Sequence, residues 1–428
     1  MTTYLSTGSP ETVISRAQQK DHLQSALAQF GSLQRVLIIP PDFTRFHSGA
    51  GEITEDVYQL LNGSAVIDIL PALGTHSPMA ESQIENMFGS VPRDRIHVHD
   101  WRNGLVKLGE VPRDFVSEVS GGRVDYAINI ELNRMLTDAN YDLILSVGQV
   151  VPHEVIGMAN QNKNIFVGTG GKDTINKTHF LGAVVGMENI MGRSQTAVRA
   201  VFNFAEDNFT PNLPIVYALT VRSNNDDGNL VTRGLYIGEG TECFNDAARL
   251  SQQVNLDLLD EPLQKVVVFL DPGEFKSTWL GNKSVYRTRM AMADDGELIV
   301  LAPGLKEFGE DGEIDCLIRK YGHRGTRETL DAVKQNDDLA ANLSAAAHLI
   351  HGSSEGRFSI TYAPGHLSRT EIESVNSQYA DLDQMLERYD PGKLRDGLNV
   401  MPDGEEIFYI SNPALGLWAL REQFLDSQ

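Results

Sequence analysis

The sequence predicts an α/β protein of two domains with a cleft between them, whose mostly parallel sheets are covered by helices. Short apolar runs alternate with helix-type patterns, as in strands joined by covering helices. The 428 residues exceed what one hydrophobic core usually serves. A break near Glu261–Pro262 separates two such series. We therefore expect a cofactor-binding catalytic domain over 1–262, a second α/β domain over 263–403, and a C-terminal helix over 404–428 that could pack back on the first domain.

In the first domain, strands and helices alternate from residue 35 onward. The apolar run RVLIIP predicts a strand over 35–40, followed by a helix around 52–62 and a strand over 64–73. A helix should begin after Pro78 and close at Gly89. The remaining expected strands are RIHVHDW, YDLILSVG and an antiparallel pair, IVYALTVRS and GNLVTRGLYIGEG, joined by a turn at Asn225 to Gly228.

The second domain begins with another apolar strand. KVVVFLDPG predicts a strand, and further strands are expected at GELIVLAPG, FSITYAP and LNVMPDG. VYRTRMAM and IDCLIRKYG read as helices, and NPALGLWALREQF reads as the C-terminal helix.

Composition narrows the function classes. The net charge of −22 argues against non-specific nucleic-acid binding, which needs a basic face. No apolar run approaches the ~20 residues of a membrane-spanning helix, and the N-terminus lacks a secretory-signal pattern. With only two cysteines, a reducing cytoplasm is expected and disulfide scaffolding is not. A soluble cytoplasmic protein with a small-molecule ligand fits these features.

Polar groups follow three of the expected strands. Asp42, Thr44 and Arg45 come directly after the first strand, where they could fix a phosphate or carboxylate. Taken alone, this motif is better explained by an N-cap Asp or Thr with a solvated arginine. His76 follows the second strand, where a lone histidine is more often structural than catalytic. Because ligands of open α/β folds bind at the carboxyl edge of the sheet, these groups are candidates for one site.

The third polar segment follows YDLILSVGQ and carries His153, Lys163 and His179. Two imidazoles and an amine can move protons, hold a metal or bind a cofactor covalently. The segment also contains Gly168-Thr169-Gly170-Gly171, a candidate phosphate cradle if a helix begins near Thr174. A flexible connection is the competing explanation. Because no GxGxxG follows the first strand, ordinary dinucleotide dehydrogenase chemistry is disfavoured.

In the second domain, Trp279 and Lys283 lie one helical turn apart after the first strand. They could present an aromatic wall and a cation to a substrate carboxylate. An exposed helix with an extended lysine explains these two residues equally well.

These segments together resemble the nickel-pincer-nucleotide-dependent lactate racemase family. The D-x-T-R motif appears as Asp42 to Arg45, and G-T-H as Gly74 to His76. P-H-E followed by a lysine ten residues on appears as Pro152 to Lys163, and T-I-x-x-x-H as Thr174 to His179. None of the four is specific alone, but their order and spacings together are.

The resemblance implies a 2-hydroxy acid racemase or epimerase with a cofactor made by dedicated maturation enzymes. Lys163 matches the tethering lysine, His179 the nickel ligand, and His76 and His153 the two acid/base residues. Arg45 matches a substrate-side cation, and Lys283 or its neighbour the carboxylate-binding lysine. Further contacts follow from the same reading: Asp42, Thr44, Gly170 and Gly171 to the cofactor, and Trp279 to the substrate.

One departure from the family pattern concerns the residues before the lysine. The family commonly has S-G-G-R-K, where this chain has Ala159-Asn160-Gln161-Asn162-Lys163. Amide side chains suit hydroxyl-rich ligands because each can donate and accept hydrogen bonds. We therefore expect Asn160 and Gln161 to contact a substrate larger and more polar than lactate, such as an aldonate.

Two other functions remain open at this level. A zinc hydrolase could use His76, His153 and His179, but would leave Lys163 without a role. A non-catalytic nucleotide- or sugar-binding protein could use the cleft between two domains. The sequence does not indicate the oligomeric state.

Overall fold

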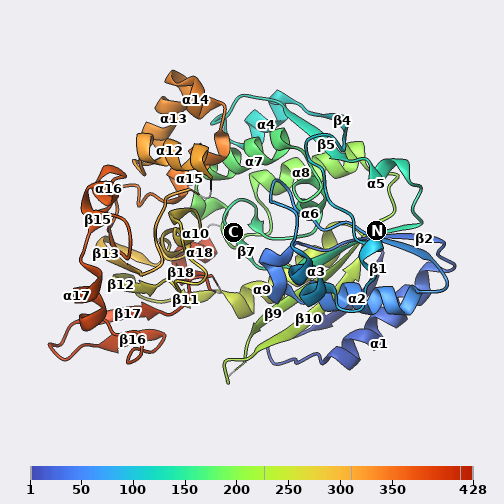
Figure 1. Ribbon diagram of the computed structural model, residues 1–428, viewed down its shortest axis with the longest axis horizontal. Helices are drawn as coiled ribbons and strands as arrows, with labels where there is room; N and C mark the ends of the chain where they lie inside the picture. The colour runs from blue at the N-terminus through green and yellow to red at the C-terminus, as the bar shows by residue number, and fades with distance from the viewer. Residues whose placement is uncertain (1, 226, 310, 415, 427–428) are drawn as a thin grey trace. The chain divides into compact units, whose positions relative to one another are not determined.

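The structure is a computed structural model that describes residues 2–225, 227–309, 311–414 and 416–426 (Figure 1). The chain forms two compact units, and the first closes at Asn255 rather than at residue 262. The second contains the chain from Leu256 onward together with the segment His179–Asn189. The division therefore falls inside helix α7 (Lys172–Val185).

The first unit is built on a six-stranded mixed sheet. The four neighbouring strands β9, β6, β2 and β3 are parallel to one another. Beyond β9, the strands β10 and β1 each pair antiparallel with their neighbour. In sheet order the strands are β1 (Thr3–Gly8), β10 (Leu230–Gly238), β9 (Ile215–Asn224), β6 (Leu143–Gln149), β2 (Arg35–Ile39) and β3 (Val66–Ile69). The strands predicted at 35–40, 64–73 and YDLILSVG and the predicted antiparallel pair are confirmed, although residue 226 of its turn lies outside the described residues.

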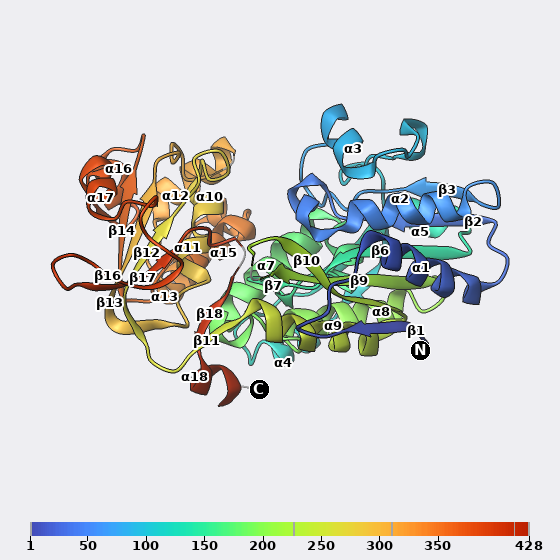
Figure 2. The same cartoon turned by 90° about the horizontal axis from the view of Figure 1, so that it is seen from below.

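Helices cover both faces of this sheet. Val36 and Ile38 of β2 join a core that α1, α2 and α3 complete from one side. On β9 and β10, helix α9 packs against the strands. Figure 2 shows α2 and α9 on opposite sides of this sheet. In chain order the helices are α1 (Arg16–Leu27), α2 (Ala50–Leu61), α3 (Glu81–Phe88), α4 (Arg113–Val119), α5 (Met135–Asp138), α6 (Asn162–Phe166), α8 (Ala197–Phe209) and α9 (Gly240–Asn255).

The strand order creates a switch point between β2 and β6. From β2 the chain crosses to β3 on one side, whereas β6 lies on the other side of β2. Loops leaving the carboxyl ends of such neighbours diverge and open a crevice, which is where open α/β sheets bind ligands. Two two-stranded elements flank this region of the chain: β4 (Leu105–Val111) with β5 (Ile128–Asn133), and β7 (Pro152–His153) with β8 (Gly157–Met158).

The second unit has its own six-stranded sheet, parallel except for β16 at one edge. Val267, Ile299 and Tyr409 belong to its core, against which α17 packs. In sheet order the strands are β15 (Gln378–Tyr379), β14 (Ser359–Pro364), β13 (Met292–Ala302), β12 (Leu263–Phe269), β17 (Glu406–Ile410) and β16 (Gly397–Val400). The helices are α10 (Thr278–Gly281), α11 (Lys283–Tyr286), α12 (Gly312–Tyr321), α13 (Thr326–Gln335), α14 (Asp337–Ala340), α15 (Leu343–His351), α16 (Arg369–Ser374), α17 (Leu382–Arg388) and α18 (Arg421–Asp426).

Three predicted elements are wrong. Residues 95–101 form no strand: Ile96 makes one isolated bridge to Ile69, and His99 turns into the interior instead of alternating outward. The predicted helix VYRTRMAM ends at Tyr286, because Met292 already begins β13.

The predicted C-terminal helix is the third error. Within 404–428, β17 pairs with β12, and β18 (Trp418–Leu420) pairs in parallel with β11 (Asp257–Leu259), so that only α18 is helical. Residues 415, 427 and 428 of that prediction lie outside the described residues. Tertiary pairing overrides local helix propensity here, because Trp418 and Ala419 gain a strand partner and burial together. Among the described residues, no helix has the length and apolarity to span a bilayer.

Candidate active site

The polar segments that follow the first two predicted strands are joined by a hydrogen bond. Asp42 follows β2 and His76 follows β3, and Oδ2 of Asp42 lies 2.6 Å from Nδ1 of His76. The carboxylate is buried, whereas the His76 side chain is 59% exposed. Burial opposes ionisation of Asp42, but the bonds from His76 and Thr44 outweigh it and lower the pKa of the carboxyl. Asp42 therefore remains an anion that orients a solvent-accessible imidazole.

Thr44 and Arg45 lie in a short 3-10 segment that Asp42 caps. The Asp42 side chain accepts hydrogen bonds from the backbone N–H and hydroxyl of Thr44. Both Thr44 and Arg45 are exposed. The N-cap explanation of this motif is thus correct for Asp42, and it coexists with the bond to His76.

His153 lies in the two-residue strand β7, opposite Gly157 of β8, and is buried. The backbone N–H of Val155 donates to its Nδ1 at 3.1 Å. In the neutral ring this bond makes Nδ1 the acceptor and leaves the proton on Nε2. The Glu154 carboxylate lies 3.6 Å from the same Nδ1, a distance suited to charge pairing rather than to a hydrogen bond.

Lys163 lies in the first turn of α6, after the β7–β8 hairpin. Burial lowers the pKa of its amine to about 8, assisted by the positive charge of Arg45 and opposed by the negative charges of Glu154 and Asp42. Among the described residues, none forms a hydrogen bond or ion pair with this amine. A lysine with such a pKa carries a substantial fraction of neutral, nucleophilic amine at physiological pH.

Asn164 anchors α6 to the switch point. Its side-chain amide donates to the backbone carbonyl of Ile39, the last residue of β2, at 2.9 Å. It also donates to the hydroxyl of Ser146 on β6 at 3.1 Å. Helix α6 is therefore tied to β2 and β6, the two parallel strands that flank the switch point. Lys163 is held near their carboxyl ends. Asn164 belongs to none of the sequence motifs, so its role follows from the structure alone.

The amides before Lys163 have partners within the protein. Asn160 and Gln161 are buried, and the Gln161 side chain accepts from Arg199 and donates to Glu206. Asn162 makes the same two kinds of contact. The structure therefore gives Gln161 a structural role where the sequence predicted a substrate contact, and the Asn160 amide donates to Val147. Arg199 and Glu206 carry no motif signal, since an arginine and a glutamate on an amphipathic helix usually face solvent.

The glycines of the candidate phosphate cradle are explained by close packing. A Cβ on Gly170 would lie 1.9 Å from the backbone oxygen of Phe166, and one on Gly171 would lie 2.2 Å from Oε2 of Glu131. His99 also holds this loop, because its Nε2 donates to the Gly170 carbonyl at 3.1 Å while Nδ1 accepts from Asn133. Packing thus accounts for Gly170 and Gly171 without a bound anion, and their contact with a phosphate remains a prediction.

Helix α7 begins at Lys172, two residues earlier than predicted, and carries both Thr174 and His179. Thr174 is buried and its hydroxyl donates to the Asn129 carbonyl of β5, which ties the start of α7 to the β4–β5 hairpin. His179 lies more than one turn further along, where the chain enters the second unit.

Trp279 and Lys283 belong to the second unit, on the consecutive short helices α10 and α11. Trp279 stacks on His348 with 4.5 Å between ring centroids. Asn282 between them is buried, donates towards His348 and accepts from the Tyr362 hydroxyl at 2.6 Å. These bonds fix the turn that carries both predicted residues, and the buried histidines His323 and His348 were not identified from sequence.

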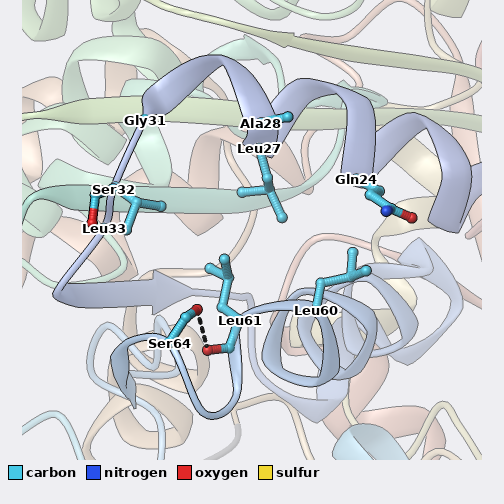
Figure 3. A pocket seen from close by; sticks show the side chains of 9 residues that line it. All are labelled: Gln24, Leu27, Ala28, Gly31, Ser32, Leu33, Leu60, Leu61 and Ser64. Carbon is cyan, nitrogen blue, oxygen red and sulfur yellow. Dashed lines mark hydrogen bonds between the residues drawn. The ribbon is translucent and has the colours of Figure 1, made fainter.

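A pocket of about 300 Å³ lies elsewhere in the first unit, between α1 and α2 (Figure 3). Leu27 and Leu61 face each other across it, and Ser64 donates to the Leu61 carbonyl. Its polar side chains are an amide and hydroxyls, none of which is an acid or base near neutral pH. This pocket is therefore separate from the chemistry described above.

Fold and site together define a two-domain α/β protein. At the switch point of its mixed sheet, the first unit carries a lysine of lowered pKa together with histidines and carboxylates. Residues 2–192 match the family described as the lactate racemase N-terminal domain, and the resemblance predicted from the sequence is confirmed.

Solved structures support the same fold over the whole chain. A crystal structure of a Thermotoga maritima protein is similar with a TM-score of 0.79 and 23% identity, covering 95% of this chain and 98% of that one. The lactate racemase apoprotein from Thermoanaerobacterium thermosaccharolyticum is similar with a TM-score of 0.70 and 16% identity, covering 96% and 93%. The predicted α/β fold is confirmed. None of the curated proteins matches this sequence.

Proposed function

We propose that this protein is a racemase or epimerase that inverts C2 of a 2-hydroxy acid, using a nickel-pincer nucleotide tethered to Lys163. The observation that carries the proposal is the Lys163 amine at the switch point, beside the Asp42–His76 pair. Burial lowers the pKa of this amine to about 8. The lactate racemase N-terminal domain of residues 2–192 and the shared fold support it.

The residues present fit such a cofactor. Covalent attachment through an amine requires the neutral form, and the pKa of Lys163, about 8, provides it near physiological pH. His179 would supply the protein's imidazole ligand to nickel, a reasonable partner for sulfur-bound nickel. Asp42, Thr44, Gly170 and Gly171 would surround the nucleotide. When bound, the cofactor supplies a ring carbon that accepts a hydride and returns it.

His76 is suited to take the substrate's hydroxyl proton. Because Asp42 accepts the Nδ1–H of His76, the neutral ring presents Nε2 as a base. When Nε2 gains a proton, the adjacent carboxylate stabilises the imidazolium and keeps the ring in place. Hydride loss from a 2-hydroxy acid is easier when a base removes the hydroxyl proton at the same time, so this pair meets a specific demand of the reaction.

His153 would act from the other side of the substrate carbon. Its neutral ring holds a proton on Nε2, because Nδ1 accepts from Val155. A second proton would go to Nδ1 in place of the hydrogen bond from Val155, and the Glu154 carboxylate, 3.6 Å from that nitrogen, is a nearby counter-charge. Inversion requires acid/base groups on both sides, and the two histidines have separate carboxylates to support their charged forms. Which histidine serves which enantiomer follows from the direction of substrate binding.

Substrate recognition is assigned to cations. As the family resemblance implies, Arg45, Lys283 and Trp279 would hold the carboxylate and one face of the substrate through both half-reactions. The preference for a substrate larger and more polar than lactate was inferred from the amides before Lys163. Since Gln161 is occupied by Arg199 and Glu206, that inference loses its basis, and the proposal extends only to 2-hydroxy acids as a class.

The zinc hydrolase is less well supported. It requires three protein ligands around one ion, and among the described residues no three His, Cys, Asp or Glu side chains form such a group. The racemase proposal requires only one imidazole from the protein as a metal ligand. A non-catalytic binding protein would give Asp42 no reason to orient an exposed imidazole.

Intact-mass and nickel analysis after co-expression with the cofactor-making enzymes tests the proposal. The wild-type chain should gain the mass of one nucleotide and about one nickel, with racemase activity on a 2-hydroxy acid. Lys163→Ala should gain neither, whereas His179→Ala should keep the added mass and lose nickel. Lys172→Ala, at an exposed lysine nine residues further on, is the matched control and should load normally. An unmodified wild-type chain under conditions that load an authentic lactate racemase would refute the proposal.

A further inference from the structure

Arg199 of α8 is buried and directs its guanidinium at the turn before Lys163. Its Nη2 donates to the Met158 carbonyl at 2.7 Å. Its Nη1 donates to the Asn160 carbonyl at 3.2 Å and to the side-chain oxygens of Gln161 and Asn162. One side chain thus donates to four acceptors within five consecutive residues.

This turn has a backbone conformation that side chains rarely adopt. Asn160 has φ 66°, and Gln161 has φ 57° with ψ −131°. Left-handed conformations of this kind are strained for non-glycine residues and persist only where the surroundings enforce them. Glycine adopts them without that steric cost. Two consecutive strained residues directly before α6 therefore need an external constraint.

The network around Arg199 supplies that constraint. Glu206, seven residues after Arg199 on the same helix, accepts from Gln161 and Asn162 and from the Tyr217 hydroxyl. Burial lowers the pKa of Arg199 to about 9 and raises the pKa of Glu206. Two buried groups of opposite charge, joined through the amides of the turn, are stable only when the turn keeps its shape.

We propose that Arg199 is a positioning residue for Lys163: its four hydrogen bonds hold Asn160 and Gln161 in the left-handed turn that starts α6 and sets the place of the amine. The inference rests on the proposed function for its purpose, since Lys163 is there the attachment point of the cofactor. Arg199 contacts neither the amine nor any reacting atom, so its role is positional and not catalytic.

The apo-protein tests this without any cofactor. Lys163 is acetylated by acetic anhydride over a pH series and quantified by peptide mass spectrometry, with exposed Lys172 as the internal reference. Arg45, Glu154, Asp42 and Arg199 are the charges acting on the amine. In the wild type, the midpoint of labelling should lie near pH 8. In Arg199→Met and Arg199→Lys, the amine should relax towards solvent and the labelling midpoint should rise by about one pH unit. At pH 7 the labelling of Lys163 should then be about tenfold lower than in the wild type.

A double substitution separates position from charge. Asn160→Gly with Gln161→Gly allows the turn to form without an external constraint, so adding it to Arg199→Met should return the midpoint to near the wild-type value. Because the Arg199 charge is still absent, such a rescue must come through the backbone. Wild-type labelling in Arg199→Lys, or failure of the glycines to rescue, would overturn the proposal.

If Arg199→Met does not fold by circular dichroism, Arg199→Lys with and without the two glycines decides in the same way. The result is independent of the racemase proposal. A wild-type chain that never loads nucleotide would refute the function, whereas the labelling midpoints would still establish or reject the positioning role.

Discussion

Nδ1 of His76 lies 2.6 Å from Oδ2 of Asp42, although the two residues follow different strands and are 34 positions apart. The bond orients an exposed imidazole from a buried carboxylate, and it is the most direct acid/base arrangement at the switch point. Its significance is open to a matched test, because the same unit contains a second such pair: His97 and Asp68, with Nε2 3.0 Å from Oδ1.

Asp42→Asn should therefore reduce kcat of the loaded enzyme by about 10²-fold, the scale of a lost general acid–base contribution. An amide can donate to Nδ1 and so turn the ring into the tautomer without a basic Nε2. The racemisation rate, followed by chiral chromatography, gives the measurement. Asp68→Asn is the control and should leave kcat unchanged. Equal losses in both variants would show that the pair at Asp42 has no special function.

Lys163→Met should stabilise the apo-protein in a pH-dependent way. The pKa of Lys163 is about 8 in the folded chain and about 10.4 in the unfolded chain, so the folded state binds fewer protons between these values. The penalty for the charged amine is fully present below pH 8 and disappears as the pH rises through 10.4. It corresponds to roughly 3 kcal/mol.

Urea unfolding at pH 7 and at pH 10.5 measures this difference. The increment of Lys163→Met over wild type should be large at pH 7 and close to zero at pH 10.5. Lys172→Met, at an exposed position, should show no such dependence. A Lys163→Met increment equal at both pH values would contradict a depressed pKa of the amine.

Gly170→Ala should destabilise the apo-protein by about 1–3 kcal/mol or more, the range for overpacking a well-filled interior. The added methyl would lie 1.9 Å from the Phe166 carbonyl oxygen, which belongs to the backbone of α6 and cannot rotate away. Gly312→Ala is the control, because a Cβ there meets no atom within 4 Å. If Gly170→Ala were as stable as wild type but failed only in nucleotide loading, the phosphate cradle would be the better explanation of the loop.

Gln161→Ala should leave substrate preference unchanged. Its amide is buried and bonded to Arg199 and Glu206, so it cannot also face a substrate. Values of kcat/KM for lactate, malate, phenyllactate and gluconate should fall together. A loss confined to gluconate would restore the predicted substrate role of the amide, and fastest turnover of lactate by the wild type would exclude a preference for larger substrates.

Local periodicity identified the strongest elements correctly. The strand at 35–39 is apolar at four of its five positions because it is central and covered on both faces, and the pattern at 50–61 marks an amphipathic helix. The errors occur where local pattern and tertiary partner disagree. Ile96 and Val98 alternate as in a strand, but His97 is bound by Asp68 and His99 by Asn133 and Gly170, so the segment follows its side chains instead of the sheet.

The sequence by itself determined which residue types stand at the carboxyl ends of the strands: a carboxylate, histidines and a lysine. Strand and loop order follow from local pattern, and functional side chains collect where strands end. Only the tertiary structure decided that Asp42 meets His76, that burial lowers the pKa of the Lys163 amine to about 8, and that Arg199 donates to the turn before it. Contacts between distant segments and the dielectric around a charge are properties of packing, which no spacing of residues along the chain encodes directly.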